Sequence, residues 1–143
     1  LDVTIQAQVL ELIEKLKEDF DTSLLLITHD LGVVAELCQK VAIIYAGSIV
    51  EYGTLEHVYN NTAHPYTKGL FGAIPSLDED VDRLKPIPGL MPDPTALPMG
   101  CAFSDRCEFA SEACNAGPVP VTEIEPGHLV KCVLFSGKEQ NNG

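Results

Sequence analysis

His29 is one residue of this chain whose type and position could do chemistry. It follows Thr28 at the end of the apolar run Leu24-Leu25-Leu26-Ile27, and four uninterrupted apolar residues predict a strand that is buried on both faces. In open α/β sheets, ligands gather at the carboxyl ends of the strands. One imidazole nitrogen there could donate to a phosphate oxygen or an attacking water while a neighbour holds the other nitrogen. A histidine after an apolar run is more often structural, so the surrounding sequence has to decide between the two roles.

Four cysteines form the second chemically interesting group. Cys101, Cys107, Cys114 and Cys132 follow the pattern C-x5-C-x6-C-x17-C, and four thiolates can enclose Zn²⁺ or an iron–sulfur cluster. Structural zinc sites usually pair their ligands as C-x2-4-C, and this pattern contains no such pair. Cluster ligands have wider and more varied gaps, so the spacing favours a [4Fe-4S] cluster over zinc. Free or oxidised cysteines without a metal are the alternative.

Several residues near these cysteines could support or replace them. Arg106 and Lys131 could offset the charge of a thiolate-bound cluster, or they could be solvated surface charges. His128 lies four residues before Cys132 and could substitute for a ligand, although the presence of four cysteines favours a role in holding a loop. Cys38, at a helical position, is predicted to be a small buried hydrophobe without a ligand role.

The first part of the chain predicts the elements that must position His29. Apolar residues recur at helical spacing over residues 5–20 with charged residues between them, which predicts an amphipathic helix. Residues 23–28 are the predicted buried strand, and residues 32–39 a short helix. Residues 41–52 predict a hairpin, because Gly47 permits the positive φ that a tight turn needs.

Two more helices are predicted after the hairpin. Thr54 is suited to cap a helix over residues 55–59, and Pro65 is suited to the first turn of another helix. His57 and His64 lie on or beside these helices, so we expect them to be solvated or to cap a helix end.

Composition predicts four segments along the chain. Residues 1–75 carry the α/β pattern. Residues 76–100 contain five prolines, which remove backbone donors and favour an extended connector. Residues 101–135 form a small irregular cysteine-rich extension, and residues 136–143 a frayed tail. The predicted fold class is therefore α/β with an irregular extension.

Charge and composition exclude several classes of protein. The net charge is −12 and the nine Lys and Arg residues are scattered, so a nucleic-acid partner is not expected. No apolar run approaches the roughly 18 residues of a membrane span, and no signal peptide opens the chain. Four of the five cysteines lie between positions 101 and 132. Such a group suits metal binding in a reducing compartment better than a framework of disulfide bonds. The sequence contains no G-x-x-x-x-G-K-[ST] phosphate loop, and it begins without Met, so we expect a truncated amino terminus.

Three stretches, in their order and spacing, resemble the ATP-binding subunits of ABC transporters. They are Leu1-Asp2-Val3-Thr4, Ile27-Thr28-His29-Asp30 and Tyr45-Ala46-Gly47-Ser48-Ile49-Val50-Glu51-Tyr52-Gly53. Further along, His64-Pro65-Tyr66-Thr67, the proline-rich connector and the cysteine pattern are similar to the carboxyl-terminal extension of subunits that serve oligopeptide and dipeptide importers. The resemblance covers nearly the whole chain.

This resemblance implies a fold and two functional residues. The fold would be an incomplete P-loop NTPase core followed by the cysteine-rich extension, which binds an iron–sulfur cluster in some members. Asp2 would be the D-loop aspartate at the interface of two ATP-binding subunits. His29 would be the switch histidine that contacts the γ-phosphate of ATP bound with Mg²⁺. The phosphate loop, signature motif and catalytic glutamate would precede residue 1, so the isolated chain is expected not to hydrolyse ATP.

The resemblance also implies instability of the isolated fragment. In the family's sheet, the strand that carries the phosphate loop lies between the histidine strand and the strand that begins here near Val41. Without it, two apolar strands would have unpaired edges, and we expect residues 1–60 alone to be marginally stable.

Function and partners follow from the same resemblance. The complete protein would be an ATPase that powers import of oligopeptides or dipeptides, as a peripheral subunit at the cytoplasmic face of the membrane. Its partners would be a second ATP-binding subunit, membrane permease subunits and, indirectly, an extracytoplasmic peptide-binding protein. One alternative is a stand-alone iron–sulfur or zinc protein with a redox role. Another is a non-catalytic regulatory module that binds a partner through its extension.

Overall fold

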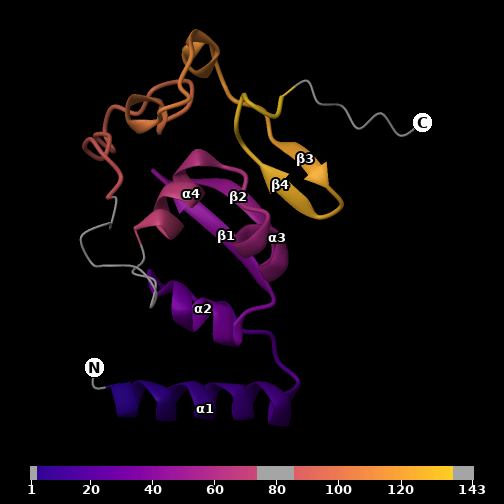
Figure 1. Cartoon of the computed structure of the whole chain (residues 1–143). Coiled ribbons are helices and arrows are strands. Elements are labelled where there is room, and N and C mark those ends of the chain that lie inside the picture. The colour runs from indigo at the N-terminus through magenta and orange to yellow at the C-terminus, as the bar shows by residue number, and fades with distance from the viewer. Residues whose placement is uncertain (1–2, 74–85, 137–143) are drawn as a thin grey trace. The chain divides into compact units, whose positions relative to one another are not determined.

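The computed structural model describes residues 3–73 and 86–136, which contain both helices and sheet (Figure 1). The chain forms two compact units, Leu1–Gln39 and Lys40–Gly143. Within the described residues, no helix is both long enough and apolar enough to cross a lipid bilayer. The mixture of helices and sheet expected from the sequence is confirmed. The boundary expected at residue 75 lies outside the described residues.

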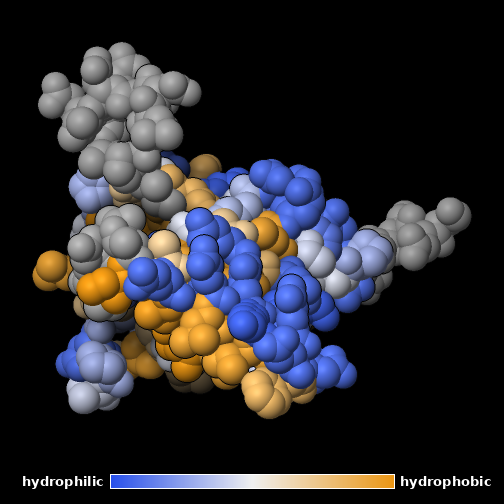
Figure 2. Space-filling view, turned by 90° about the horizontal axis from the view of Figure 1, so that it is seen from below, coloured by the Kyte–Doolittle hydropathy of each residue, from blue (hydrophilic) through white to orange (hydrophobic). Residues whose placement is uncertain are grey.

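The first unit contains two helices, α1 (Val3–Phe20) and α2 (Leu31–Leu37). The Asp30 side chain caps α2 by accepting from the backbone N–H groups of Gly32 and Val33, at 3.0 and 3.2 Å. Both helices agree with the sequence pattern. The apolar stripe of α1 is exposed, with Leu12 at 57% and Phe20 at 69% of full exposure. Figure 2 shows an apolar area beside a hydrophilic band on the face seen from below.

The predicted buried strand over residues 23–28 is wrong. This segment has no regular secondary structure, and Leu25 and Ile27 are 86% and 88% exposed. A buried strand needs hydrogen-bonded neighbours on both edges and cover on both faces. No strand within residues 3–73 and 86–136 pairs with this segment, so its backbone stays outside any sheet.

The second unit is built on a four-stranded antiparallel sheet with the order β1-β2-β4-β3. Its strands are β1 (Lys40–Tyr45), β2 (Ser48–Thr54), β3 (Thr122–Glu125) and β4 (His128–Val130). The β1–β2 hairpin is confirmed: Ala46 and Gly47 turn the chain with φ of 48° and 80°. Such positive angles at both central residues match the right-handed twist of hairpin strands.

A second hairpin, between β3 and β4, brings the cysteine-bearing part of the chain back to the first one. Pro126 and Gly127 form its turn, and Gly127 has a φ of 82°, a conformation that glycine adopts without steric cost. Strand β4 then pairs with β2, where Val130 lies opposite Glu51. The proline–glycine pair was a usable turn signal that the sequence interpretation did not take up.

Helices α3 (Leu55–Asn60) and α4 (Pro65–Gly72) follow the first hairpin. The Thr54 hydroxyl accepts from the backbone N–H of His57, and the His57 ring accepts from that of Thr54, so α3 begins with a reciprocal cap. Pro65 occupies the first turn of α4. Both starts agree with the sequence because capping depends on local residue types.

Arg106 holds the described end of the proline-rich connector. Its guanidinium donates to the carbonyls of Pro88, at 2.9 Å, and Ile87, at 3.2 Å. It also reaches the Tyr45 hydroxyl at 3.4 Å. The Tyr45 ring packs against Tyr66 and Phe103, with centroid distances of 4.6 and 5.3 Å. Arg106 is thus a clamp between the connector and the core, rather than a free surface charge.

Candidate functional site

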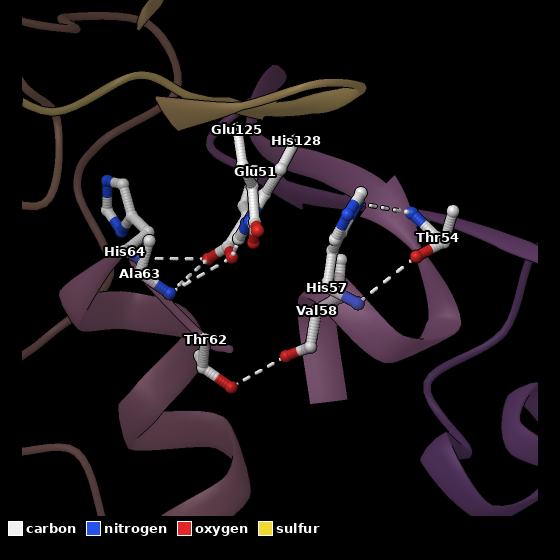
Figure 3. Close-up of polar contacts among 9 residues, drawn as sticks. All are labelled: Glu51, Thr54, His57, Val58, Thr62, Ala63, His64, Glu125 and His128. Atoms are coloured by element: carbon white, nitrogen blue, oxygen red, sulfur yellow. Dashed lines mark hydrogen bonds and ion pairs between the residues drawn. The ribbon is translucent and has the colours of Figure 1, made fainter. Parts of the chain in front are cut away.

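The carboxyl group of Glu51 is the polar centre of the second unit. It projects from β2, is 1% exposed, and accepts from the backbone N–H groups of Ala63, at 3.0 Å, and His64, at 2.8 Å. These donors belong to the chain entering α4, where helical backbone N–H groups have no partner within the helix. Glu51 therefore fastens the start of α4 to the sheet (Figure 3).

His128 completes this centre from β4. Its Nε2 lies 2.7 Å from Glu51, and its Nδ1 lies 3.0 Å from Glu125. The ring is fully buried and stacks on the ring of His57 at a centroid distance of 5.0 Å. The hydrogen bond from His128 lowers the pKa of Glu125. His128 links β4 to β2 and so acts as the structural tie expected from its sequence position.

The structure brings the four predicted cysteine ligands around one small cavity. Cys107 ends the short 3-10 helix η2 (Ser104–Arg106), Cys114 lies in the 3-10 helix η3 (Glu112–Asn115), and Cys132 follows β4. All five cysteines of the chain are free thiols, and Cys38, which ends α2, is only partly buried.

The thiols around this cavity influence one another. Burial raises the pKa values of Cys101, Cys107 and Cys132, and neighbouring cysteines raise each of them further. Lys131 acts in the opposite direction on Cys101. Metal binding would have to displace the thiol protons that these shifts favour.

The four thiols line the same cavity, but they are not arranged as the ligands of a metal ion. Within residues 3–73 and 86–136, no group of three or more His, Cys, Asp or Glu side chains is arranged to hold a metal ion.

His64 also lines the cysteine cavity. Its Nδ1 caps α4 by accepting from the backbone N–H of Tyr66 at 3.0 Å, so it has the capping role that the sequence allowed. The ring is only 1% exposed, in contrast to a solvated position. Burial lowers the pKa of His64 to about 4, against the opposing effect of Glu51.

The two residues expected to meet nucleotide belong to the first unit. His29 is exposed and lies between residues 22–28, which have no regular secondary structure, and α2. Its neighbour Asp30 is positioned by α2 and by a 3.4 Å hydrogen bond from the Gln6 side chain. Asp2 lies outside the described residues.

Comparisons with known proteins identify the relatives of this chain. The family described as oligopeptide/dipeptide transporter, C-terminal region, matches residues 50–114. The oligopeptide transport ATP-binding protein OppD of Haemophilus influenzae is 47% identical over 138 residues, which cover 96% of this chain and 42% of that protein. A protein of Brucella abortus named as a peptide import ATP-binding protein is 44% identical over 132 residues, covering 92% of this chain and 40% of its own length.

Residues 50–114 belong to the oligopeptide/dipeptide transporter C-terminal region, and the chain is a homologue of peptide transport ATP-binding proteins. It spans about two fifths of the length of these curated relatives. The family expected from the sequence motifs is thereby confirmed, and the relatives give no support to a stand-alone metal-cluster protein. The matched region includes Glu51, His64 and three of the four cysteines.

Two structurally central residues of this family region were missed by sequence reasoning. Glu51 occupies a strand position in which an acidic residue is normally solvated, and its partner His128 lies 77 residues away. Gly100 directly precedes Cys101, and the backbone N–H of Cys101 donates to the carbonyl of Cys114 at 2.7 Å. The usable signal at Gly100 was a glycine directly beside a candidate ligand, because glycine permits close approach of two backbones.

Gly100→Ala is expected to disrupt the cysteine cavity. A Cβ at position 100 would lie 2.0 Å from the Cys114 carbonyl oxygen and 2.9 Å from the Asn115 Cα. Both are backbone atoms that cannot rotate away, so we expect a loss of about 1–3 kcal/mol in the free energy of unfolding. Urea denaturation of the wild type and the variant measures this loss in the free energy of unfolding. Gly72→Ala is the matched control, since its Cβ would meet no atom within 4 Å, and equal stability of the two variants would contradict the prediction.

The depressed pKa of His64 predicts acid sensitivity. The unfolded chain, with a histidine pKa near 6.5, binds a proton before the folded chain, with a pKa of about 4. The contribution of neutral His64 to the free energy of unfolding therefore has its full value above pH 6.5. The free energy of unfolding falls by about 2–3 kcal/mol as the pH drops from 6.5 to 4. Urea titrations at a series of pH values measure the slope. His64→Asn keeps a capping acceptor but does not titrate, so it should flatten the curve; an unchanged slope would exclude His64 as the cause.

Proposed function

We propose that this chain is the carboxyl-terminal part of an ATP-hydrolysing subunit that powers ABC-type import of oligopeptides or dipeptides. The observation that carries the proposal is the 47% identity to an oligopeptide transport ATP-binding protein over 96% of the chain. The matching transporter C-terminal region over residues 50–114 supports it independently. Isolated residues 1–143 would not hydrolyse ATP, because the phosphate loop that binds ATP and Mg²⁺ would lie in the rest of the protein.

Two residues of this chain would act on the nucleotide side. His29 would donate a hydrogen bond from its imidazole to the γ-phosphate of ATP, and its exposed position just before α2 leaves the ring accessible. Asp2 would lie at the interface with a second ATP-binding subunit. ATP held between two such subunits would draw them together, and hydrolysis would release them.

The exposed apolar side chains of the first unit suit a place within a larger domain. Leu24, Leu25 and Ile27 are 42%, 86% and 88% exposed, which is unfavourable for an isolated surface. In the complete protein, neighbouring strands of the ATP-binding domain would pair with this segment and cover it. The subunit would then dock on membrane permease subunits at the cytoplasmic face, with an extracytoplasmic peptide-binding protein as an indirect partner.

The test is ATP-dependent peptide uptake by the complete transporter. The full-length protein is reconstituted with its permease subunits in vesicles. These vesicles are expected to transport labelled oligopeptide or dipeptide only when ATP is present on the side of the membrane where the ATP-binding subunit is bound. Replacement of ATP by a non-hydrolysable analogue should stop accumulation. Equal uptake with the analogue would contradict the proposed role.

We further propose that Cys101, Cys107, Cys114 and Cys132 hold a [4Fe-4S] cluster, with Zn²⁺ as the alternative metal. The supporting observation is that all four thiols line one cavity, and thiolates are ligands of both zinc and iron–sulfur clusters, although the four side chains are not arranged to hold a metal ion in this structure. Burial raises the pKa of Cys101, and the Lys131 charge opposes that rise only in part. A bound cluster would supply either a rigid cross-link or a one-electron centre.

Metal analysis of anaerobically purified full-length protein tests the cluster. About four iron atoms per chain and a broad visible absorbance are expected, and Cys114→Ser should lose most of both. Cys38→Ser is the matched control and should retain them. One zinc atom per chain without iron would favour the alternative metal, whereas the absence of both metals would contradict the site.

A further inference from the structure

A second cavity, of about 140 Å³, lies beside the turn of the β1–β2 hairpin. We call it the hairpin cavity. An engineered cavity of about 150 Å³ with apolar walls binds benzene, so this volume suits one ring or a branched aliphatic group. The walls include four buried apolar or aromatic residues with exposed fractions between 2% and 7%, namely Tyr45, Val50, Phe103 and Val119.

The proline-rich connector supplies another part of the wall. Leu97 and Met99 line the hairpin cavity, yet they are 44% and 81% exposed. Exposed apolar surface that borders a cavity is covered when an apolar group enters, and that burial favours binding. The fold thus leaves apolar surface open at this cavity that an occupant would bury.

The hairpin cavity differs from the cysteine cavity, because successive residues after β4 serve different cavities. The backbone N–H of Lys131 donates to the Val50 carbonyl at 2.8 Å, so the chain continues beside β2 beyond the end of β4. Successive side chains of an extended chain point to opposite faces. Accordingly, Lys131 lines the hairpin cavity and Cys132 lines the cysteine cavity.

Lys131 gives the hairpin cavity a positive charge that no carboxylate balances. Among the described residues, the ion pairs are those of His128, and the Lys131 ammonium has none. No Asp or Glu belongs to the cavity lining in this part of the chain. The Lys131 charge acts on Cys101, another lining residue, which supports a position of the ammonium on the cavity side.

We propose that the hairpin cavity binds a small carboxylate with an apolar or aromatic body. The body would lie among Val50, Phe103 and Val119, and the carboxylate would accept a charge-assisted hydrogen bond from Lys131. Small-molecule sites typically combine apolar walls with a few polar groups that fix the orientation of the ligand. The small volume favours a free acid over the end of a peptide chain. This inference goes beyond the proposed role in peptide import and does not depend on the cysteine cavity.

The experiment uses full-length protein with ¹³C-methyl-labelled methionine and benzoate as the probe. The methyl signal of Met99, assigned from a Met99→Leu variant, is expected to shift with benzoate in a saturable manner. The signal of Met91, which does not line the cavity, should stay in place. Benzamide has the same shape without the charge, and we expect it to bind at least about tenfold more weakly, as for the loss of one charge-assisted hydrogen bond.

Variants separate the charge from the shape of the cavity. Lys131→Met should weaken benzoate binding at least about tenfold, to the level of benzamide. Lys68→Met is the matched control, because Lys68 is exposed and lies outside the cavity lining. Val119→Phe should fill the cavity and prevent binding of both probes. Tyrosine fluorescence checks its folding, and if it does not fold, Ala102→Leu fills the cavity from a partly exposed position.

Three results would overturn the inference. The first is a Met99 signal that benzoate does not shift saturably. The second is equal binding of benzoate and benzamide, or benzoate binding that Lys131→Met leaves unchanged. The third is tighter binding of a dipeptide that ends in phenylalanine than of benzoate, which would assign the cavity to the end of a peptide chain. None of these results bears on ATP-dependent peptide uptake, so the proposed function is tested separately.

Discussion

Glu51→Ala is expected to lower the free energy of unfolding of the second unit by about 3–5 kcal/mol, because it leaves several buried donors without an acceptor. The backbone N–H groups of Ala63 and His64 and the Nε2 of His128 all contact this carboxyl group. Removal of one partner from such a buried network costs more than the network contributes when complete.

Tyrosine fluorescence during urea denaturation measures this loss selectively. All four tyrosines of the chain lie in residues 45–66 and there is no tryptophan, so the signal reports on the second unit alone. A Glu51→Ala variant that is already unfolded without urea would also agree with the prediction.

Glu125→Ala is the matched control for this prediction. Glu125 binds the other nitrogen of the same His128 ring, but its side chain is 39% exposed. Exposed ion pairs contribute about 0–1 kcal/mol. Glu51→Gln, which keeps one acceptor oxygen, should lie between the two alanine variants. If Glu51→Ala cost no more than Glu125→Ala, the central role of Glu51 would be excluded.

The same carboxyl group connects the sheet to the cysteine cavity. It holds the His64 backbone at the start of α4 and, through His128, the short strand that leads into Cys132. We therefore infer that Glu51 supports the geometry of the cavity from two sides, even though it lies outside the cavity lining.

The elements that sequence reasoning predicted correctly depend on local chemistry. Thr54 and Pro65 mark helix starts because capping and a fixed φ act within one turn. Gly47 marks the hairpin because the turn needs positive φ at that point. These signals act over a few residues, and the structure places each of them as expected.

The features that escaped prediction depend on partners far along the chain. Nothing near Glu51 in the sequence indicates that it meets His128, 77 residues later. The apolar run over residues 23–28 predicted a buried strand, and the structure has this segment outside any sheet, with Leu25 and Ile27 exposed. The expected strand fails because an apolar pattern specifies burial only when other strands are present to pair with it.

The cysteine site lies between these two cases. The spacing of Cys101, Cys107, Cys114 and Cys132 pointed to a common site, and the fold does gather them around one cavity. The pattern could not reveal that His64, 37 residues before the first of them, lines the same cavity, because that depends on how α4 packs.

His29→Ala is expected to reduce the ATP hydrolysis rate of the full-length protein by at least about 100-fold. A hydrogen bond to the γ-phosphate is most valuable where negative charge develops during hydrolysis, and loss of one such donor typically costs 10²–10³ in rate. Steady-state phosphate release at saturating ATP measures kcat. ATP binding, measured separately with a fluorescent analogue, should change much less, since the phosphate loop would provide most of the affinity.

Two companion variants show whether the imidazole itself is responsible. Glu36→Ala changes an exposed residue of α2, seven residues after His29 in the sequence, and should leave kcat unchanged. His29→Gln keeps a donor of similar reach and should retain more activity than His29→Ala. Because the His29 ring is exposed and the side chain that caps α2 is that of Asp30, a loss of activity would not be explained by unfolding. Unchanged hydrolysis in His29→Ala would instead assign this histidine to the structural role that its position after an apolar run also allows.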